Sequence, residues 1–189
     1  MSLLLQVWGG LFYLLNKVFL SVAERSERNN RKKKKTWRVT SWVVYLLGTP
    51  SWIFLFIKEH NWIAAALEAG GIPSMIIGLI ITIKGKGKEP MWLNYIAIIS
   101  IVIGLGYSWY DFNGIRTFHQ FAEIVMIAAF LIGTYQIAQE KLSGYVWFMI
   151  MNGACMLLMY LDHYPWLVVQ QIVSVSFVID AYFVKKKKT

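Results

Sequence analysis

The chain has 189 residues, of which 57% are hydrophobic, 16% are aromatic and only 15% are charged. A soluble domain usually carries about a quarter charged residues, and the long apolar runs of this chain leave no polar shell that could cover them. The composition therefore excludes the ordinary soluble classes and indicates an integral membrane protein.

Seven apolar segments follow one another along the chain. Each is close to the ~20 residues that a helix needs to cross about 30 Å of hydrocarbon. We predict transmembrane helices over residues 2–22, 38–57, 62–83, 91–110, 117–138, 144–161 and 165–184. The expected fold class is an all-α membrane protein, with residues 1–189 forming a single transmembrane domain.

The basic residues between these segments predict the orientation of the chain. The regions after the first, third, fifth and seventh segments contain eight, three, one and four lysines or arginines, whereas the alternate regions contain only Lys58 and Arg116. Positive charge concentrates on the cytoplasmic side of a membrane. We therefore expect the N-terminus outside and the C-terminus in the cytoplasm.

The lengths of the segments also suggest an internal repeat. When Trp62 is aligned with Trp166, both regions show a span, a short polar turn, a tryptophan and a further span. Residues 1–83 and 117–184 would then form two three-helix bundles, with 91–110 as a linker helix. A single linker leaves both bundles in the same orientation, which gives a 3+1+3 arrangement of parallel repeats. Parallel repeats of this kind occur among membrane carriers.

Several other functions are disfavoured by the sequence. The net charge of +9 comes largely from Lys32–Lys35 and Lys185–Lys188, which flank spans, so anionic lipid explains it better than nucleic acid. Cys155 is the single cysteine, the three histidines are scattered, and no phosphate-binding, metal-binding or nucleophile motif is present. We expect no metal, no cofactor and no enzymatic activity.

Polar residues inside the spans are the candidates for a binding site, because ionisable groups in hydrocarbon are costly and usually face a cavity or a partner. Glu68 follows Trp62 by six residues, which is about 9 Å along a helix. Glu123, Gln170 and Gln171 lie at similar depths, and Lys17 is the expected positive partner of the carboxylates. The glycines and Pro73 after Glu68 are compatible with either a hinge or close packing of helices.

The stretch FAEIVMIAAFLIGTYQIAQEKLSGYVWFMIMNGACMLLMYLDHYPWLVVQQ resembles the PnuC family of vitamin and nucleoside carriers. Trp147, Phe148 and Asn152 resemble the aromatic-and-asparagine motif of that family, with Phe148 in the position four residues before the asparagine. Tyr164 and Asp180 fall near positions that are usually polar or aromatic in the last span. The resemblance covers most of the chain and is strongest from His119 to Lys185.

The resemblance implies facilitated diffusion of nicotinamide riboside, thiamine, riboflavin or a nucleoside across the cell inner membrane, followed by trapping through cytosolic phosphorylation. Nicotinamide riboside is the first choice of substrate. Carriers of this kind often associate as homo-oligomers. The expected substrate-binding residues are Glu68, Glu123, Trp147, Phe148, Asn152, Tyr164, Gln170, Gln171 and Asp180.

Two other classes of function stay open at this point. Glu68 and Glu123 could instead titrate in a proton-coupled carrier or channel. A membrane accessory protein without transport activity would also fit the composition.

Overall fold

A computed structural model of the chain describes residues 3–26, 30–58, 62–111, 117–161, 163 and 165–187. These residues form seven α-helices and no strand. The helices are α1 (Leu3–Ser26), α2 (Arg31–Lys58), α3 (Trp62–Lys84), α4 (Met91–Asp111), α5 (Phe118–Ala138), α6 (Ser143–Leu161) and α7 (Pro165–Lys186).

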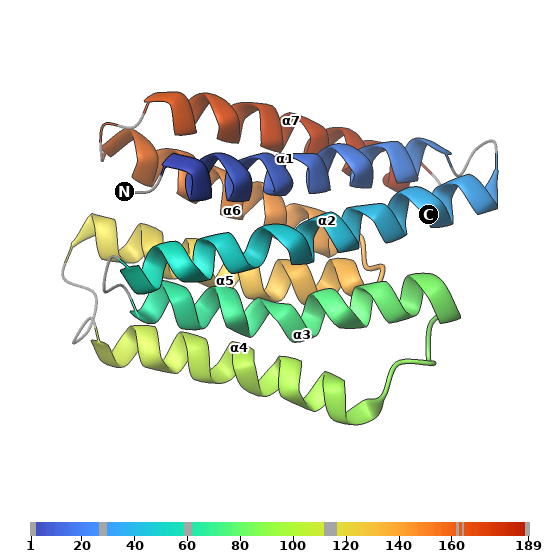
Figure 1. The fold of residues 1–189 in the computed structure, drawn as a ribbon, viewed down its shortest axis with the longest axis horizontal. Coiled ribbons are helices and arrows are strands. Elements are labelled where there is room, and N and C mark those ends of the chain that lie inside the picture. Colours follow the sequence, from blue (N-terminus) through green and yellow to red (C-terminus); the bar gives the residue numbers. More distant parts are fainter. Residues whose placement is uncertain are drawn as a thin grey trace.

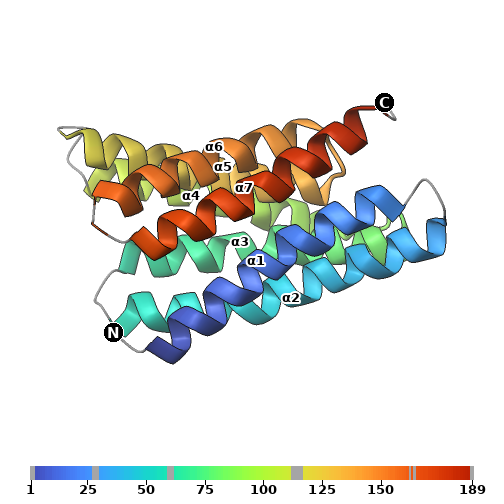
Figure 2. The ribbon, with the colours of Figure 1, turned by 90° about the horizontal axis from the view of Figure 1, so that it is seen from above.

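The helices run up and down along one long axis (Figure 1). Helix α2 packs between α1 and α3, and α6 packs between α5 and α7. Contacts of α1 with α7 and of α3 with α5 join these two groups, so that the six helices form a ring. Helix α4 lies outside the ring against α3 and α5, as the views in Figures 1 and 2 agree. The C-terminal ends of α1, α3, α5 and α7 lie at one end of the bundle, which we call the basic end (Figure 1).

The surface and the interior both fit a membrane protein. Large apolar side chains such as Leu4, Phe54, Val102 and Phe183 are more than half exposed on the surface of the bundle. In a membrane, lipid chains would cover such side chains. Six of the helices, all except α4, are long and apolar enough to cross a membrane, and α4 has a shorter apolar stretch over Met91–Ile103 within the part that the structure describes.

Helix α2 begins seven residues earlier than the span predicted at 38–57. The basic segment Arg31–Lys35 continues the helix instead of forming a loop, because lysine and arginine are good helix formers. The side chain of Asn30 caps this end, where its Oδ1 accepts from the backbone N–H of Lys32 at 2.8 Å. Arg38, which we expected to lie among the cytoplasmic loop residues, is consequently inside the bundle and only 2% exposed.

Gly71, one of the two glycines that follow Glu68, serves close packing. A Cβ atom at Gly71 would lie 2.8 Å from Cζ of Phe130, so α3 and α5 approach closely there. Helix α3 continues through Pro73 without interruption. The sequence was compatible with either a hinge or close packing of helices after Glu68, and the structure shows close packing at Gly71.

Candidate functional site

A cavity of about 380 Å³ lies in the half of the ring opposite the basic end. Its walls include Trp52 and Phe56 from the last two turns of α2, Glu68 from the first two turns of α3 and Leu167 from the first turn of α7. Cavities of about 300–1,000 Å³ are typical of small-molecule sites. The space therefore suits a compact organic ligand.

All six helices of the ring contribute to the cavity, and on each helix the lining residues recur every three or four positions and so share one helical face. Helix α4 contributes none of the described lining residues. The lining residues are Tyr13, Leu14 and Lys17 from α1; Trp52 and Phe56 from α2; Ala64, Leu67 and Glu68 from α3; Glu123, Met126, Ile127 and Phe130 from α5; Met151, Asn152, Cys155 and Met159 from α6; and Leu167, Gln170, Gln171 and Ser174 from α7.

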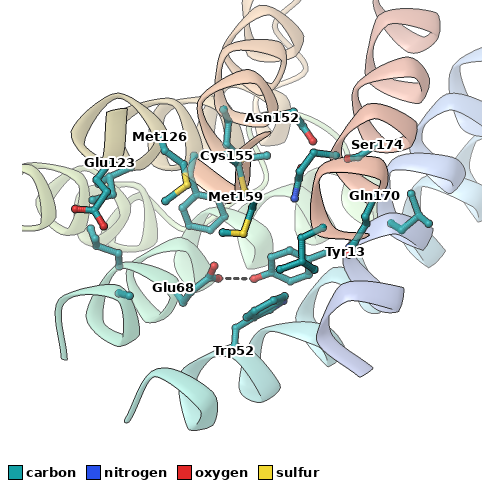
Figure 3. A pocket seen from close by; sticks show the side chains of 18 of the residues that line it. Tyr13, Trp52, Glu68, Glu123, Met126, Asn152, Cys155, Met159, Gln170 and Ser174 are labelled. Carbon is teal, nitrogen blue, oxygen red and sulfur yellow. Dashed lines mark hydrogen bonds between the residues drawn. The ribbon is translucent and has the colours of Figure 1, made fainter. Parts of the chain in front are cut away.

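Glu68 faces this cavity and accepts a hydrogen bond from the hydroxyl group of Tyr13 (Figure 3). The ring of Tyr13 is held in turn by an edge contact with Tyr45 and a tilted contact with Trp52. A carboxylate in a membrane span thus has a hydrogen-bond donor from another helix, α1, which explains why α3 tolerates it.

Lys17 also lines the cavity, although its side chain is only 2% exposed. It does not extend toward a membrane interface. Its ammonium group lies 4.5 Å from the ring centre of Tyr45 and 4.0 Å from that of Phe148. Lys17 and Glu68, which the sequence suggested as partners, line the same cavity.

The predicted amides line the cavity from α6 and α7. Asn152 on α6 donates from Nδ2 to the carbonyl oxygen of Phe148 at 2.6 Å, and its Oδ1 is buried without a hydrogen-bond partner within the described residues. Gln170 donates from Nε2 to the carbonyl oxygen of Gly10 at 3.0 Å, and so connects α7 to α1. Gln171 is the next residue of the same wall.

Glu123 lines the cavity from the second turn of α5. Its Oε1 lies 3.9 Å from Nδ1 of His119, one helical turn earlier. Figure 3 shows its carboxylate well away from the Glu68–Tyr13 pair. The two carboxylates that the sequence singled out therefore share one cavity without forming a pair.

Among the described residues, Trp147, Phe148 and Asp180 were also predicted as site residues and do not line the cavity. Trp147 points elsewhere because five residues turn a helix about 140° away from Asn152. Phe148 is on the same face, but one turn deeper, where Lys17 covers its ring. Tyr164 lies outside the described residues.

Asp180 lies near the basic end rather than at the cavity. It forms an ion pair with Arg25 and accepts a hydrogen bond from the hydroxyl group of Ser21. These contacts connect α7 to α1, and Asp180 is not among the residues that line the cavity. Its role in substrate binding stays a prediction.

Aromatic and sulfur-containing residues that the sequence analysis did not single out also line the cavity. Trp52, Phe56 and Phe130 give the cavity its flat walls, and Met126, Cys155 and Met159 supply its polarisable atoms. In the sequence, the only sign that Trp52 and Phe56 could line a cavity was their spacing of one helical turn on α2. It could not be distinguished from ordinary packing before the partner helices were known.

A buried network of charged side chains closes the bundle between the cavity and the basic end. Glu24 on α1 is fully buried, and its Oε1 accepts from Nη1 of Arg38 on α2 at 2.9 Å and from the hydroxyl group of Tyr145 on α6 at 2.8 Å. Arg38 also donates from Nη2 to the carbonyl oxygen of Ile137 on α5 at 2.9 Å. The network thus joins α1 and α2 to α5 and α6.

No family model, curated protein or solved structure matches the chain.

Proposed function

We propose that the protein is a facilitated-diffusion transporter for a vitamin precursor or nucleoside, with nicotinamide riboside as the first choice of substrate. The observation that carries this proposal is the cavity itself, which all six ring helices enclose and the Glu24–Arg38 network separates from the basic end. A site between two groups of helices and closed toward one end is the arrangement that alternating access requires.

The proposed architecture is two parallel three-helix repeats, α1–α3 and α5–α7, with α4 as the linker. The contacts support this division, because α1–α2–α3 and α5–α6–α7 each pack in sequence and α4 contacts only α3 and α5 among the described helices. The excess of lysine and arginine at the basic end supports a cytoplasmic location for that end, with the N-terminus outside.

Under this proposal the described conformation faces outward. Inward opening would separate α1 and α2 from α5 and α6 at the basic end, and so would break the bonds of Arg38 to Ile137 and of Tyr145 to Glu24. The product would be trapped in the cell by phosphorylation.

The chemistry of the cavity supports a ring-bearing substrate with polar groups. Trp52, Phe56 and Phe130 offer apolar and aromatic surface, and Glu68 and Asn152 offer acceptors for hydroxyl or amide groups. Glu68 can also complement a cationic ring.

Purified protein in proteoliposomes tests the proposal. We expect a labelled substrate from a panel of nicotinamide riboside, thiamine, riboflavin and nucleosides to enter saturably, to equilibrate without accumulation and to raise the thermal midpoint of unfolding. Collapse of uptake on addition of a protonophore would contradict uniport and favour a proton-coupled carrier. Glu68 and Glu123, which both line the cavity, are the groups that would serve that second function.

A further inference from the structure

Lys17 lies near the middle of α1, at a depth where a charged side chain is costly unless it faces a cavity or a partner. The rings that hold its ammonium group belong to Tyr45 on α2 and Phe148 on α6. Neither of these rings lines the cavity. The two rings therefore hold the ammonium group of Lys17 from the side away from the cavity, and the charged side chain faces the cavity.

The hydrogen bonds of Lys17 leave capacity for a ligand. An ammonium group has three donors, and within the described part of the chain one of them serves Oδ1 of Asn16 at 3.0 Å. The aromatic rings attract the charge but accept no conventional hydrogen bond. An acceptor oxygen from a ligand would satisfy the N–H donors of Lys17 that the rings leave without a hydrogen bond.

Glu68 supplies the opposite charge to the same cavity. Its hydrogen bond comes from Tyr13, and the ion pairs of the described residues do not include one between Glu68 and Lys17. Two opposite charges that face one low-dielectric space without direct contact create a field across it. Such a field favours a solute with complementary charges at its two ends.

We infer that the cavity takes a zwitterionic ligand, with an anionic oxygen directed at Lys17 and a cationic part directed at Glu68. This inference rests on the proposed function, keeps its class of vitamin precursors and changes the first choice within that class. It replaces nicotinamide riboside, whose amide is neutral, by precursors that carry a carboxylate or similar anionic group beside a cationic ring. Asn152 Oδ1, buried and without a partner in the described structure, accepts from a neighbouring hydroxyl group of the same ligand.

Matched ligand pairs test this inference. Nicotinamide riboside and nicotinic acid riboside share the cationic ring and the sugar. The first carries a neutral amide on the ring where the second carries a carboxylate. The pair 1-methylnicotinamide and 1-methylnicotinate makes the same comparison without the sugar. From ligand-dependent thermal midpoints we expect the wild type to bind the carboxylate member of a pair at least about tenfold more tightly, which corresponds to about 1.4 kcal/mol.

Two variants of Lys17 assign the preference to its charge. Lys17→Met keeps the length of the side chain and should lower the carboxylate-to-amide preference to about one, whereas Lys17→Arg should keep most of it. Lys86→Met removes an exposed charge near the basic end and serves as the control, with an unchanged preference expected.

Each outcome decides a different point. A wild type that binds both members of a pair equally, or prefers the amide, overturns the inference and leaves the proposed transporter intact, even if Lys17→Met fails to fold. A preference that survives in a folded Lys17→Met variant overturns the role of Lys17. Failure of all four ligands to shift the midpoint of the folded wild type overturns both the inference and the proposed substrate class.

Discussion

Glu24 and Arg38 form an ion pair of 2.9 Å in which the two side chains are 0% and 2% exposed. Removing one partner of a buried pair leaves the other charge without compensation, which typically costs about 3–5 kcal/mol. We therefore expect Glu24→Gln to lower the thermal midpoint of the purified protein markedly. Arg25→Gln, which removes the 65% exposed partner of Asp180, provides the comparison. Exposed pairs contribute about 0–1 kcal/mol, so its midpoint should change little.

The same network should act as the closed gate at the basic end, and Cys155 provides a reporter for it. Cys155 is the single cysteine of the chain and lines the cavity. In oriented proteoliposomes, a membrane-impermeant thiol reagent should label the wild type faster from the end opposite the basic end. Tyr145→Phe removes the hydrogen bond to Glu24 that joins α6 to α1, and should raise labelling from the basic end several-fold.

Ser176→Ala is the matched control for this labelling. Ser176 is exposed on α7, and its hydroxyl group bonds to the carbonyl oxygen of Ile172 in its own helix. Its variant should label like the wild type, and Cys155→Ser should not label at all. Equal labelling of Tyr145→Phe and wild type from the basic end would show that this bond does not gate the cavity.

Glu68 should discriminate substrates by charge. Glu68→Gln keeps the size of the side chain and removes the negative charge that faces the cavity. A cationic substrate should lose affinity by about tenfold, or about 1.4 kcal/mol, and a neutral nucleoside should lose much less. Binding of both ligands would be measured through thermal midpoints or competition for uptake. Equal losses for the two ligands would assign Glu68 a structural role, which the hydrogen bond from Tyr13 makes the competing explanation.

The apolar periods of the sequence predicted the helices well, and the lone charges inside them pointed to the cavity. Glu68, Glu123 and the glutamines were identified because a polar side chain in hydrocarbon is costly unless it faces a cavity or a partner. Apolar lining residues carry no such signal. Met126 and Trp52 have the same spacing as core residues, and only the packing of the six helices separates the two roles.

The early start of α2 was missed for a related reason. Lysine-rich segments next to a span normally orient the chain from a solvated loop, and this function does not depend on whether the segment is helical. The burial of Arg38 depends on a carboxylate fourteen residues earlier, Glu24, which lies opposite it only after α1 and α2 pair. Neither residue alone indicates that partnership.

Gly78 is required by the close approach of α3 to Trp42. A Cβ atom at this position would lie 2.3 Å from the Cε2 and Cζ2 atoms of the Trp42 ring, and that side chain is only 2% exposed. In an unobstructed helix, Gly→Ala stabilises by about 1 kcal/mol. Here the added methyl group overpacks the core, which typically costs about 1–3 kcal/mol. We expect Gly78→Ala to lower the thermal midpoint.

Gly153 on α6 separates packing from helix propensity. A Cβ atom at Gly153 meets no heavy atom within 4 Å in the described structure. Gly153→Ala should therefore leave the midpoint unchanged or raise it, through the propensity gain alone. Because the two substitutions are chemically identical, opposite shifts would assign the loss in Gly78→Ala to the Trp42 contact. A lowered midpoint in both variants would mean instead that α3 and α6 share a need for flexible backbone, and would favour hinges over close packing at these glycines.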